Sequence, residues 1–399
     1  MATTSFDYKG HLKYQSVITN LPANSLLQDF SDDPAIDNNL DLRLNLSSNP
    51  GAWSWHVDYQ LQARRGDRLS LLQQNPGLGF ASSSLPNDDH RVFDLTRVIS
   101  EQDGSILAHR LDRLYLSHVT SNTVFIVGRQ AVSWGNGLIY NPMDFFNPFD
   151  PAAIDTEYKT GDDMIYGQYL LESGDDLQAV WVGRRDDEHE VSNQVSSLAL
   201  KYHGFSGNRE YDLLIAEHYD QAVIALGGVT DWAQALWRSD IVISETDAGN
   251  VTSAVINWSY SWIAASKNVS AIVEYYHNGF GIDDGDYSPD NLAQHPELVT
   301  RLLRGELFTL GVNYLSAAAT VELTPLWLLT TSIFNNLDDG SSLVQFLSLH
   351  DLQQNLQLIL AVDIPTGSDG TEFGGIDSAV PGRPLSVGPT FFAQLAWYF

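Results

Sequence analysis

The chain has 399 residues with 50 acidic and 21 basic side chains, a formal net charge of -29 at pH 7, and no cysteine. Nucleic-acid binding is excluded, because the phosphate backbone requires a surface rich in Lys and Arg. The lack of cysteine excludes disulfides, thiolate metal sites and cysteine nucleophiles. No apolar stretch is long enough for a transmembrane helix. The N-terminal MATTSFDYKG is not expected to be a signal peptide, because it lacks a basic and an apolar region.

Apolar and polar residues alternate with a period of two along most of the chain, which indicates β-strands with one apolar and one wet face. In LDLRLNLSS (40–48) the leucines share a face, and in WSWHVDYQLQAR (53–64) the aromatic and aliphatic residues do. A soluble sandwich of this length would need repeated copies with breaks between them, and none is visible. Apolar faces also end in aromatic residues, as in INWSYSWI (256–263), which is typical of strands that cross a bilayer.

Eighteen strands are expected, near residues 5–18, 38–48, 53–65, 110–120, 123–134, 163–173, 176–186, 196–206, 209–218, 221–230, 233–245, 250–263, 268–279, 305–316, 319–334, 342–352, 355–365 and 389–399. Short connections such as SNPG and SGD follow even-numbered strands, whereas the long connections, near 66–109, 135–162, 280–304 and 366–388, follow odd-numbered strands. Outer-membrane barrels have short periplasmic turns and long extracellular loops. An even strand count then places both termini on the periplasmic side.

These patterns predict an all-β fold, a transmembrane antiparallel up-and-down β-barrel of about 18 strands in the bacterial outer membrane. We expect a single domain over residues 1–399, because no linker or shift in composition divides the chain. Alternation is poor near 110–120 and 209–230, so 16 strands is the alternative count. The chain ends in LAWYF, and we interpret Trp397 and Phe399 as part of the terminal signal that barrel-assembly machinery recognises.

A stretch from Val127 to Asp162 departs from simple alternation and contains the string GRQAVSWGNGLIYNPMDFFNPFDP. Its elements are Gly128-Arg129-Gln130 at a strand end, Trp134-Gly135, Asn141-Pro142-Met143-Asp144 and Asn147-Pro148-Phe149. In these elements the stretch resembles the alginate-export-like family of outer-membrane barrels. The resemblance implies an 18-stranded barrel with long loops folded over or into the lumen, and a role in moving a solute or polymer across the outer membrane.

The connection 135–162 is too apolar for an exposed loop, so its aromatic rings are expected to be buried. Two places are available: the lumen, where the loop would narrow the pore, and the barrel rim, where it would form an apolar cap. We favour the lumen. The residues expected at the constriction are Trp134, Tyr140, Asp144, Phe145, Phe146 and Phe149.

Charged residues on the polar strand faces are candidates for lining the lumen. The expected cations are Arg43, Arg64, Arg129, Lys201 and Arg238, and the expected acids are Asp41, Asp58, Asp240, Glu274 and Asp363. Two interpretations of Arg129 are open: one wall of a transverse field across the constriction, or a salt-bridge network that fixes the loop to the wall. We favour the network slightly.

Acidic runs such as SDDP and GIDDGDYSPD fall in expected extracellular loops. They lack the ligand spacing of an EF-hand loop, so we expect a solvated acidic face and no metal site. The 11 histidines are scattered and no GxSxG motif occurs, so we expect no catalytic residues and no enzyme activity. Nothing in the sequence requires a cofactor.

The sequence therefore favours a porin-like outer-membrane channel for small polar or cationic solutes, because acidic loops attract cations to the mouth. One alternative is an export conduit for a polymer or lipid that works with a periplasmic or inner-membrane transport partner. The other is a structural or adhesive surface barrel. The expected partners are outer-membrane lipid, lipopolysaccharide and the barrel-assembly machinery, with no nucleic acid.

Overall fold

A computed structural model describes residues 6–49, 51–74 and 87–399 of the chain. Its strands are β1 (Phe6–Thr19), β2 (Ala35–Ser48), β3 (Trp53–Gly66), β4 (Thr96–Gln102), β5 (Ser105–Val119), β6 (Thr123–Gln130), β7 (Asp162–Leu170), β8 (Asp176–Val182), β9 (Ser197–Ser206), β10 (Arg209–His218), β11 (Gln221–Trp232), β12 (Ala235–Thr246), β13 (Gly249–Ala264), β14 (Lys267–His277), β15 (Asn313–Thr324), β16 (Trp327–Asn336), β17 (Ser342–Gln353), β18 (Leu356–Thr366) and β19 (Thr390–Tyr398). Its helices are η1 (Leu26–Asp29), α1 (Asp67–Gln74), α2 (Pro289–Leu292) and α3 (Pro296–Arg304). Within the described residues, no helix is long and apolar enough to cross a membrane.

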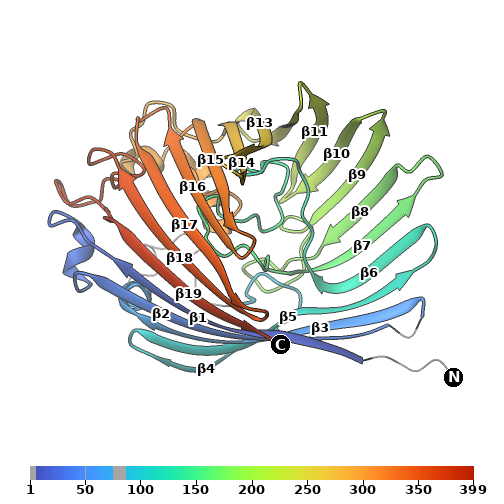
Figure 1. Ribbon diagram of the computed structural model, residues 1–399, viewed down its shortest axis with the longest axis horizontal. Coiled ribbons are helices and arrows are strands. Elements are labelled where there is room, and N and C mark those ends of the chain that lie inside the picture. The colour runs from blue at the N-terminus through green and yellow to red at the C-terminus, as the bar shows by residue number, and fades with distance from the viewer. Residues whose placement is uncertain (1–5, 50, 75–86) are drawn as a thin grey trace.

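The strands form one antiparallel sheet that closes on itself, because β1 pairs with both β2 and β19 (Figure 1). The closed ring has 18 strands, and β4 is an additional strand paired with β5. This barrel confirms the predicted fold class and the count of 18 strands. The sequence analysis missed β4, which lies in the long connection predicted near 66–109; residues 75–86 of that connection lie outside the described residues.

The two ends of the barrel differ in their connections, as the parity of the sequence predicts. One end carries only short turns, such as 207–208 and 265–266. The other end carries the four longest connections, at 67–104, 131–161, 278–312 and 367–389. Both termini lie at the short-turn end: Phe6 pairs with Ser48 beside the β2–β3 turn, and the Tyr398 N–H donates to the Asn355 carbonyl oxygen in the β17–β18 turn at 2.9 Å.

The outer face of the barrel is apolar and the inner face is polar. On β11 and β12, for example, Leu226 and Ile241 point outward and are exposed. On β2, Asp41 and Arg43 point inward and are buried. A barrel that kept a hydrophobic core in water would have the opposite arrangement, so this pattern is that of a sheet solvated by lipid.

The two regions of poor alternation have different causes. In β5, a register shift opposite Asp58 leaves Asp112 and Arg113 both beside one partner residue, and this bulge moves the outward positions from Leu111 to Leu114. In β10 and β11, inward positions such as Leu214 are apolar. Alternation is lost there because the inner wall carries a second apolar surface.

Two predicted strands were placed wrongly. The strands expected at 305–316 and 319–334 are β15 and β16, which occupy Asn313–Thr324 and Trp327–Asn336. The apolar residues before Asn313 pack under a loop instead of entering the wall, and the turn contains Pro325. Proline lacks the N–H that an interior ladder position needs, so it marks this turn and argues against a strand through it.

Candidate functional site

The connection 131–161 between β6 and β7, here called the pore loop, lies inside the ring of strands (Figure 1). It is held by inward-facing side chains around most of the wall. In chain order its contacts reach Gln178 on β8, Asp212 on β10, Asp240 on β12, Glu274 on β14, Ser316 on β15, Gln345 on β17, Lys13 on β1, Tyr398 on β19 and Arg113 on β5. The loop therefore follows the inner wall and reduces the width of the lumen.

Glu274 binds the backbone of the pore loop directly. Its carboxylate accepts hydrogen bonds from the N–H groups of Leu138 at 2.8 Å, Ile139 at 3.1 Å and Tyr140 at 2.5 Å. The side chain is 0 % exposed. Three consecutive N–H groups aimed at one carboxylate form an anion-binding nest, here occupied by the protein's own acid.

Asp240 holds the preceding part of the loop. It accepts from the Asn136 backbone N–H at 2.6 Å and from the Asn136 amide at 2.7 Å, and it is 0 % exposed. Gly227 on β11 leaves room for this contact: a Cβ there would strike Asp240, the Asn136 amide and Met143. Asp240 and Glu274 were expected to line the open lumen; instead, the pore loop covers both and uses their charge for docking.

The aromatic residues of the loop fill two inner hydrophobic clusters. Trp134 and Phe146 meet edge to face with 5.6 Å between ring centroids and pack on inward residues of β8 to β12. Tyr140 stacks on Tyr276 of β14 at 4.8 Å. The inward apolar residues of the wall match these rings, which is why alternation fails in β10 and β11.

Asp144, Phe145 and Phe149, the other residues expected at the constriction, lie in the middle of the loop. The buried Asp144 pairs with Lys159 at 2.6 Å, so the middle of the loop is tied to its end. Phe145 is partly buried, and Phe149 stays exposed. The rings of the loop thus divide into a docked set and a set that faces open space.

The last part of the loop spans the seam where the first and last strands meet. Lys13 of β1 pairs with Asp155 at 2.6 Å and with Glu157 at 2.8 Å. Glu157 also accepts from the Tyr398 hydroxyl of β19 at 2.9 Å. The loop therefore joins both edges of the seam from inside.

A basic strip runs along the inner face of β1, β2, β3 and β5. Its members are Lys13, Arg43, Arg64, Arg110 and Arg113. Asp112 lies among them and pairs with Arg43 at 2.8 Å and Arg113 at 2.9 Å. Sequence reasoning missed three of these cations, in part because the bulge in β5 turns Arg113 inward against the alternation.

Arg129 was expected among the charges that line the lumen, but it does not face the open lumen. It is 2 % exposed and pairs with Asp88 at 3.0 Å and Asp163 at 2.9 Å. It also donates to the Phe93 carbonyl oxygen at 2.6 Å. The network fixes the segment before β4 against the short strands β6 and β7. It is a salt-bridge network, as the favoured interpretation proposed, but it holds the β3–β5 connection and not the pore loop.

The remaining predicted charges all point into the barrel. Arg64 and Arg238 stay partly exposed, whereas Asp41, Asp58 and Lys201 are buried in ion pairs or hydrogen bonds. The predicted assembly-signal residues have the opposite orientation. Trp397 and Phe399 are exposed on the outer face, with 5.0 Å between ring centroids.

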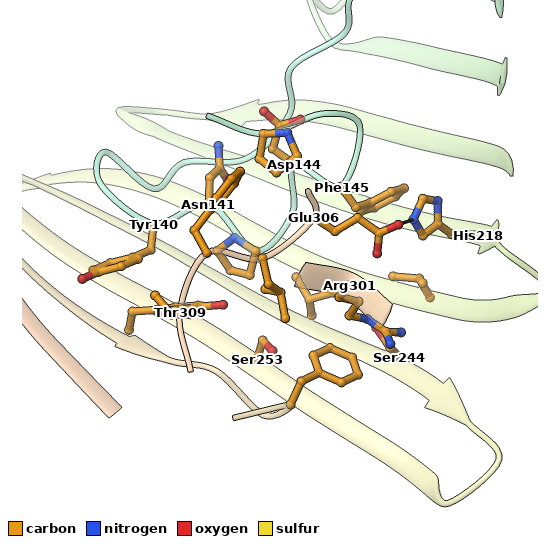
Figure 2. Close-up of a pocket in the computed structure, with 18 of the residues that line it drawn as sticks. Tyr140, Asn141, Asp144, Phe145, His218, Ser244, Ser253, Arg301, Glu306 and Thr309 are labelled. Atoms are coloured by element: carbon orange, nitrogen blue, oxygen red, sulfur yellow. Dashed lines mark hydrogen bonds and ion pairs between the residues drawn. The ribbon is translucent and has the colours of Figure 1, made fainter. Parts of the chain in front are cut away.

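The connection 278–312, here called the lid, forms a pocket together with the pore loop (Figure 2). The helix α3 of the lid begins with Pro296 in its first turn and ends at Gly305 in the left-handed conformation. Leu298 and Leu302 of α3 form a small core with Tyr287. The lid is therefore a folded element with its own apolar cluster.

Several contacts fix the lid to the tip of the β10–β11 hairpin. His218 Nε2 lies 3.1 Å from Glu306 Oε1 (Figure 2), and the Tyr219 ring lies 3.6 Å from the Arg304 guanidinium. His218 Nδ1 also lies 2.8 Å from the Ser197 hydroxyl on β9. The wall and the lid thus share one hydrogen-bond chain.

Glu372 joins the lid to the connection 367–389. It accepts from the Leu310 N–H at 3.0 Å, the Tyr314 hydroxyl at 2.6 Å and the Asn336 amide at 2.7 Å. Burial raises the pKa of Glu372 to about 7. The charge of this carboxyl therefore changes near neutral pH, and no sequence motif marks it.

Within the described residues, no group of three or more His, Cys, Asp or Glu side chains could hold a metal ion. The acidic run GDDM (161–164) contributes Asp162 and Asp163 to the start of β7, where they pair with arginines. The fold and the site together define a closed 18-stranded barrel narrowed by one inserted loop.

No family model and no curated protein matches the sequence. Solved structures match over the whole chain. OccAB1 of Acinetobacter baumannii is 10% identical with a TM-score of 0.54, covering 99% of this chain and 96% of that chain. OccK8 (OprE) of Pseudomonas aeruginosa is 8% identical with a TM-score of 0.54, covering 99% and 98%. A BenF-like porin from Pseudomonas fluorescens Pf-5 is 9% identical with a TM-score of 0.54, covering 100% and 99%.

These similarities show the fold. They also show that the resemblance to the alginate-export-like family was misleading. The structures similar to this chain are porins of the Occ and OprD group, and they match from end to end. The earlier resemblance rested on about 36 residues around the pore loop. Their motifs have local roles here: Gly135 fits against the Asn141 side chain, where a Cβ would collide, and Asp144 pairs with Lys159.

Proposed function

We propose that the protein is a porin-like channel of the bacterial outer membrane that passes small polar or cationic solutes. The observation that carries the proposal is the pore loop, which follows the inner wall of a closed barrel and narrows its lumen. The apolar outer face supports a position in the bilayer. The net charge of -29 favours cations over anions at the mouth.

The orientation follows from the two ends of the barrel. Short turns at one end and long connections at the other match periplasmic and extracellular sides. Because both termini lie at the short-turn end, we place both in the periplasm. The lid and the connection 367–389 then face the outside.

Single-channel conductance in a planar bilayer under a KCl gradient tests the proposal. The full chain is compared with a variant lacking residues 138–149 of the pore loop. We expect a steady cation-selective current that rises severalfold on deletion, because the loop occupies lumen cross-section. Deleting residues 186–190, which lie in another connection of the same end and are exposed or partly exposed, is the control and should leave the current unchanged.

Silence of both the full chain and the pore-loop deletion would reject the channel. The structural or adhesive surface barrel would then be the function to test, through binding of the purified protein to host or abiotic surfaces. An anion-selective current would keep the channel but reject the cationic cargo.

A further inference from the structure

The pocket under the lid is walled by aromatic rings from two separate loops. Phe145 and Phe149 come from the pore loop, and Phe280 and Phe308 come from the lid. The cavity between these walls has a volume of about 70 Å³, so any ligand held there is small. Aromatic walls on two sides favour a flat ring, which they contact edge to face or in offset stacks.

The charged side chains at this pocket already have partners. Glu306 lies 3.1 Å from the His218 ring, and Asp144 pairs with Lys159 at 2.6 Å. Arg301 donates to Glu297 and lies 3.8 Å from the ring centre of Phe280. A charged solute would lose water here without gaining a free counter-charge, and that loss costs several kcal/mol.

One hydroxyl group of the wall remains available. Ser244 on β12 lines the pocket, and within the described residues its side chain makes no hydrogen bond. The neighbouring Ser253 already accepts from the Gly279 N–H at 3.1 Å. A sugar would bury several hydroxyl groups beside phenyl rings with too few partners, whereas a ring with a single hydroxyl can be satisfied.

We propose that this pocket binds an uncharged monocyclic aromatic alcohol, with the ring against the phenyl side chains that line the pocket and the hydroxyl on Ser244. The inference rests on the proposed channel function, because it names the class of solute held at the outer side of the constriction. Binding itself requires only the pocket, so it can be measured without any current.

Isothermal titration of the full chain in detergent, with protein-free micelles as the blank, tests the proposal with one ring in three charge states. The probes are benzyl alcohol, benzoate and benzylammonium. We expect saturable binding of benzyl alcohol, and binding at least about tenfold weaker for the two ions.

Ser244→Ala should weaken the binding of benzyl alcohol about three- to tenfold, which corresponds to the loss of one hydrogen bond. Ser239→Ala, on the outer face of the same strand, is the matched control and should change nothing.

The outcomes separate this inference from the channel. No saturable binding, or an ion that binds as tightly as the alcohol, overturns the pocket assignment even if the protein conducts. Equal affinities for the wild type and Ser244→Ala overturn the role of the hydroxyl. Binding of benzyl alcohol by a protein that carries no current would uphold the pocket while the channel function fails.

Discussion

At the scale of single residues, Glu274 connects the wall to the middle of the pore loop. Its carboxylate is the acceptor for the N–H groups of Leu138, Ile139 and Tyr140. Buried N–H groups that lose their partner cost about 1–3 kcal/mol. Removing this side chain should therefore loosen the middle of the pore loop without changing the wall.

Glu274→Ala is expected to speed hydrogen exchange of the amides of residues 138–140 by about tenfold to 100-fold, in line with a loss of about 1–3 kcal/mol of local stability. Exchange followed by mass spectrometry measures this. Glu245→Ala, an exposed acid on β12, serves as the control and should leave the loop unchanged. Unchanged exchange in Glu274→Ala would show that the aromatic contacts alone hold the loop.

Glu372 makes the docking of the outer connections depend on pH. Its pKa is raised from 4.5 to about 7 by burial, so the folded state binds its proton more tightly than the unfolded state. The stabilisation is fully present below pH 4.5 and is lost as the pH rises through 7; its size is on the order of 3 kcal/mol. Protection of the Leu310 amide should fall between pH 5 and 8 after correction for intrinsic exchange. Glu372→Gln should remove this dependence, and a variant with the same slope would contradict it.

The inward charges could be predicted from strand alternation, but their roles could not. Alternation places Asp240 and Glu274 on the inner face, and they lie there. It does not reveal that the pore loop covers them, because the contact joins residues more than 100 positions apart. Arg113 was missed because the bulge in β5 reverses the alternation locally.

At the scale of elements, the pore loop packs against β11 because Gly227 has no side chain. Gly227 faces inward beneath Asn136 and Met143. Its φ lies outside the left-handed region, so the need for glycine here is steric and concerns the loop alone.

Gly227→Leu is expected to displace the loop from the wall and to raise single-channel conductance, because four added carbons cannot fit beside Met143. Gly228→Leu is the matched control. Gly228 is the next residue along the strand, and its Cβ would meet one backbone oxygen, that of Glu210, at 3.1 Å. Equal conductance in both variants would mean that the loop adjusts without leaving its site.

Element boundaries were predictable for most strands in which one face meets lipid and the other meets polar groups, although the start of β5 and the end of β8 were four to five residues off. They failed at β15, where apolar residues before Asn313 pack inside the lid cluster, and a single sequence does not distinguish that core from a lipid-facing strand. They also failed at the end of β6, which was extended to residue 134 although the chain turns into the lumen after Gln130. In both places a loop has its own hydrophobic core.

At the scale of the whole molecule, the apolar outer face indicates that lipid surrounds the barrel. Leu226 lies outward near the middle of β11. Leu226→Arg is expected to lower the free energy of unfolding in lipid vesicles by about 2–4 kcal/mol, the cost of a cation near the bilayer midplane. Thr252→Arg, exposed near the long-connection end of β13, should cost about 0–1 kcal/mol. Equal costs measured by urea titration would remove the lipid-facing assignment.

The overall architecture was the most predictable level, and the family was the least. Alternation and the aromatic ends of the apolar faces predicted the barrel, and strand parity predicted its two unlike ends and the shared side of the termini. The short string from Val127 to Asp162 suggested a family that the full-length comparisons replace. A motif that shapes one loop is a local solution, whereas the path of 18 strands involves the whole chain.

The ion pairs and the hydrogen bond that join the pore loop to both edges of the seam have a consequence for biogenesis. Lys13 lies on the first strand of the barrel and Tyr398 on the last, yet both bind the same short segment at Asp155 and Glu157. That segment can bind both strands only when the last strand has paired with the first. Insertion of the loop and closure of the ring are therefore coupled. A chain that closes with the loop outside the barrel lacks the contacts that join its first and last strands from inside.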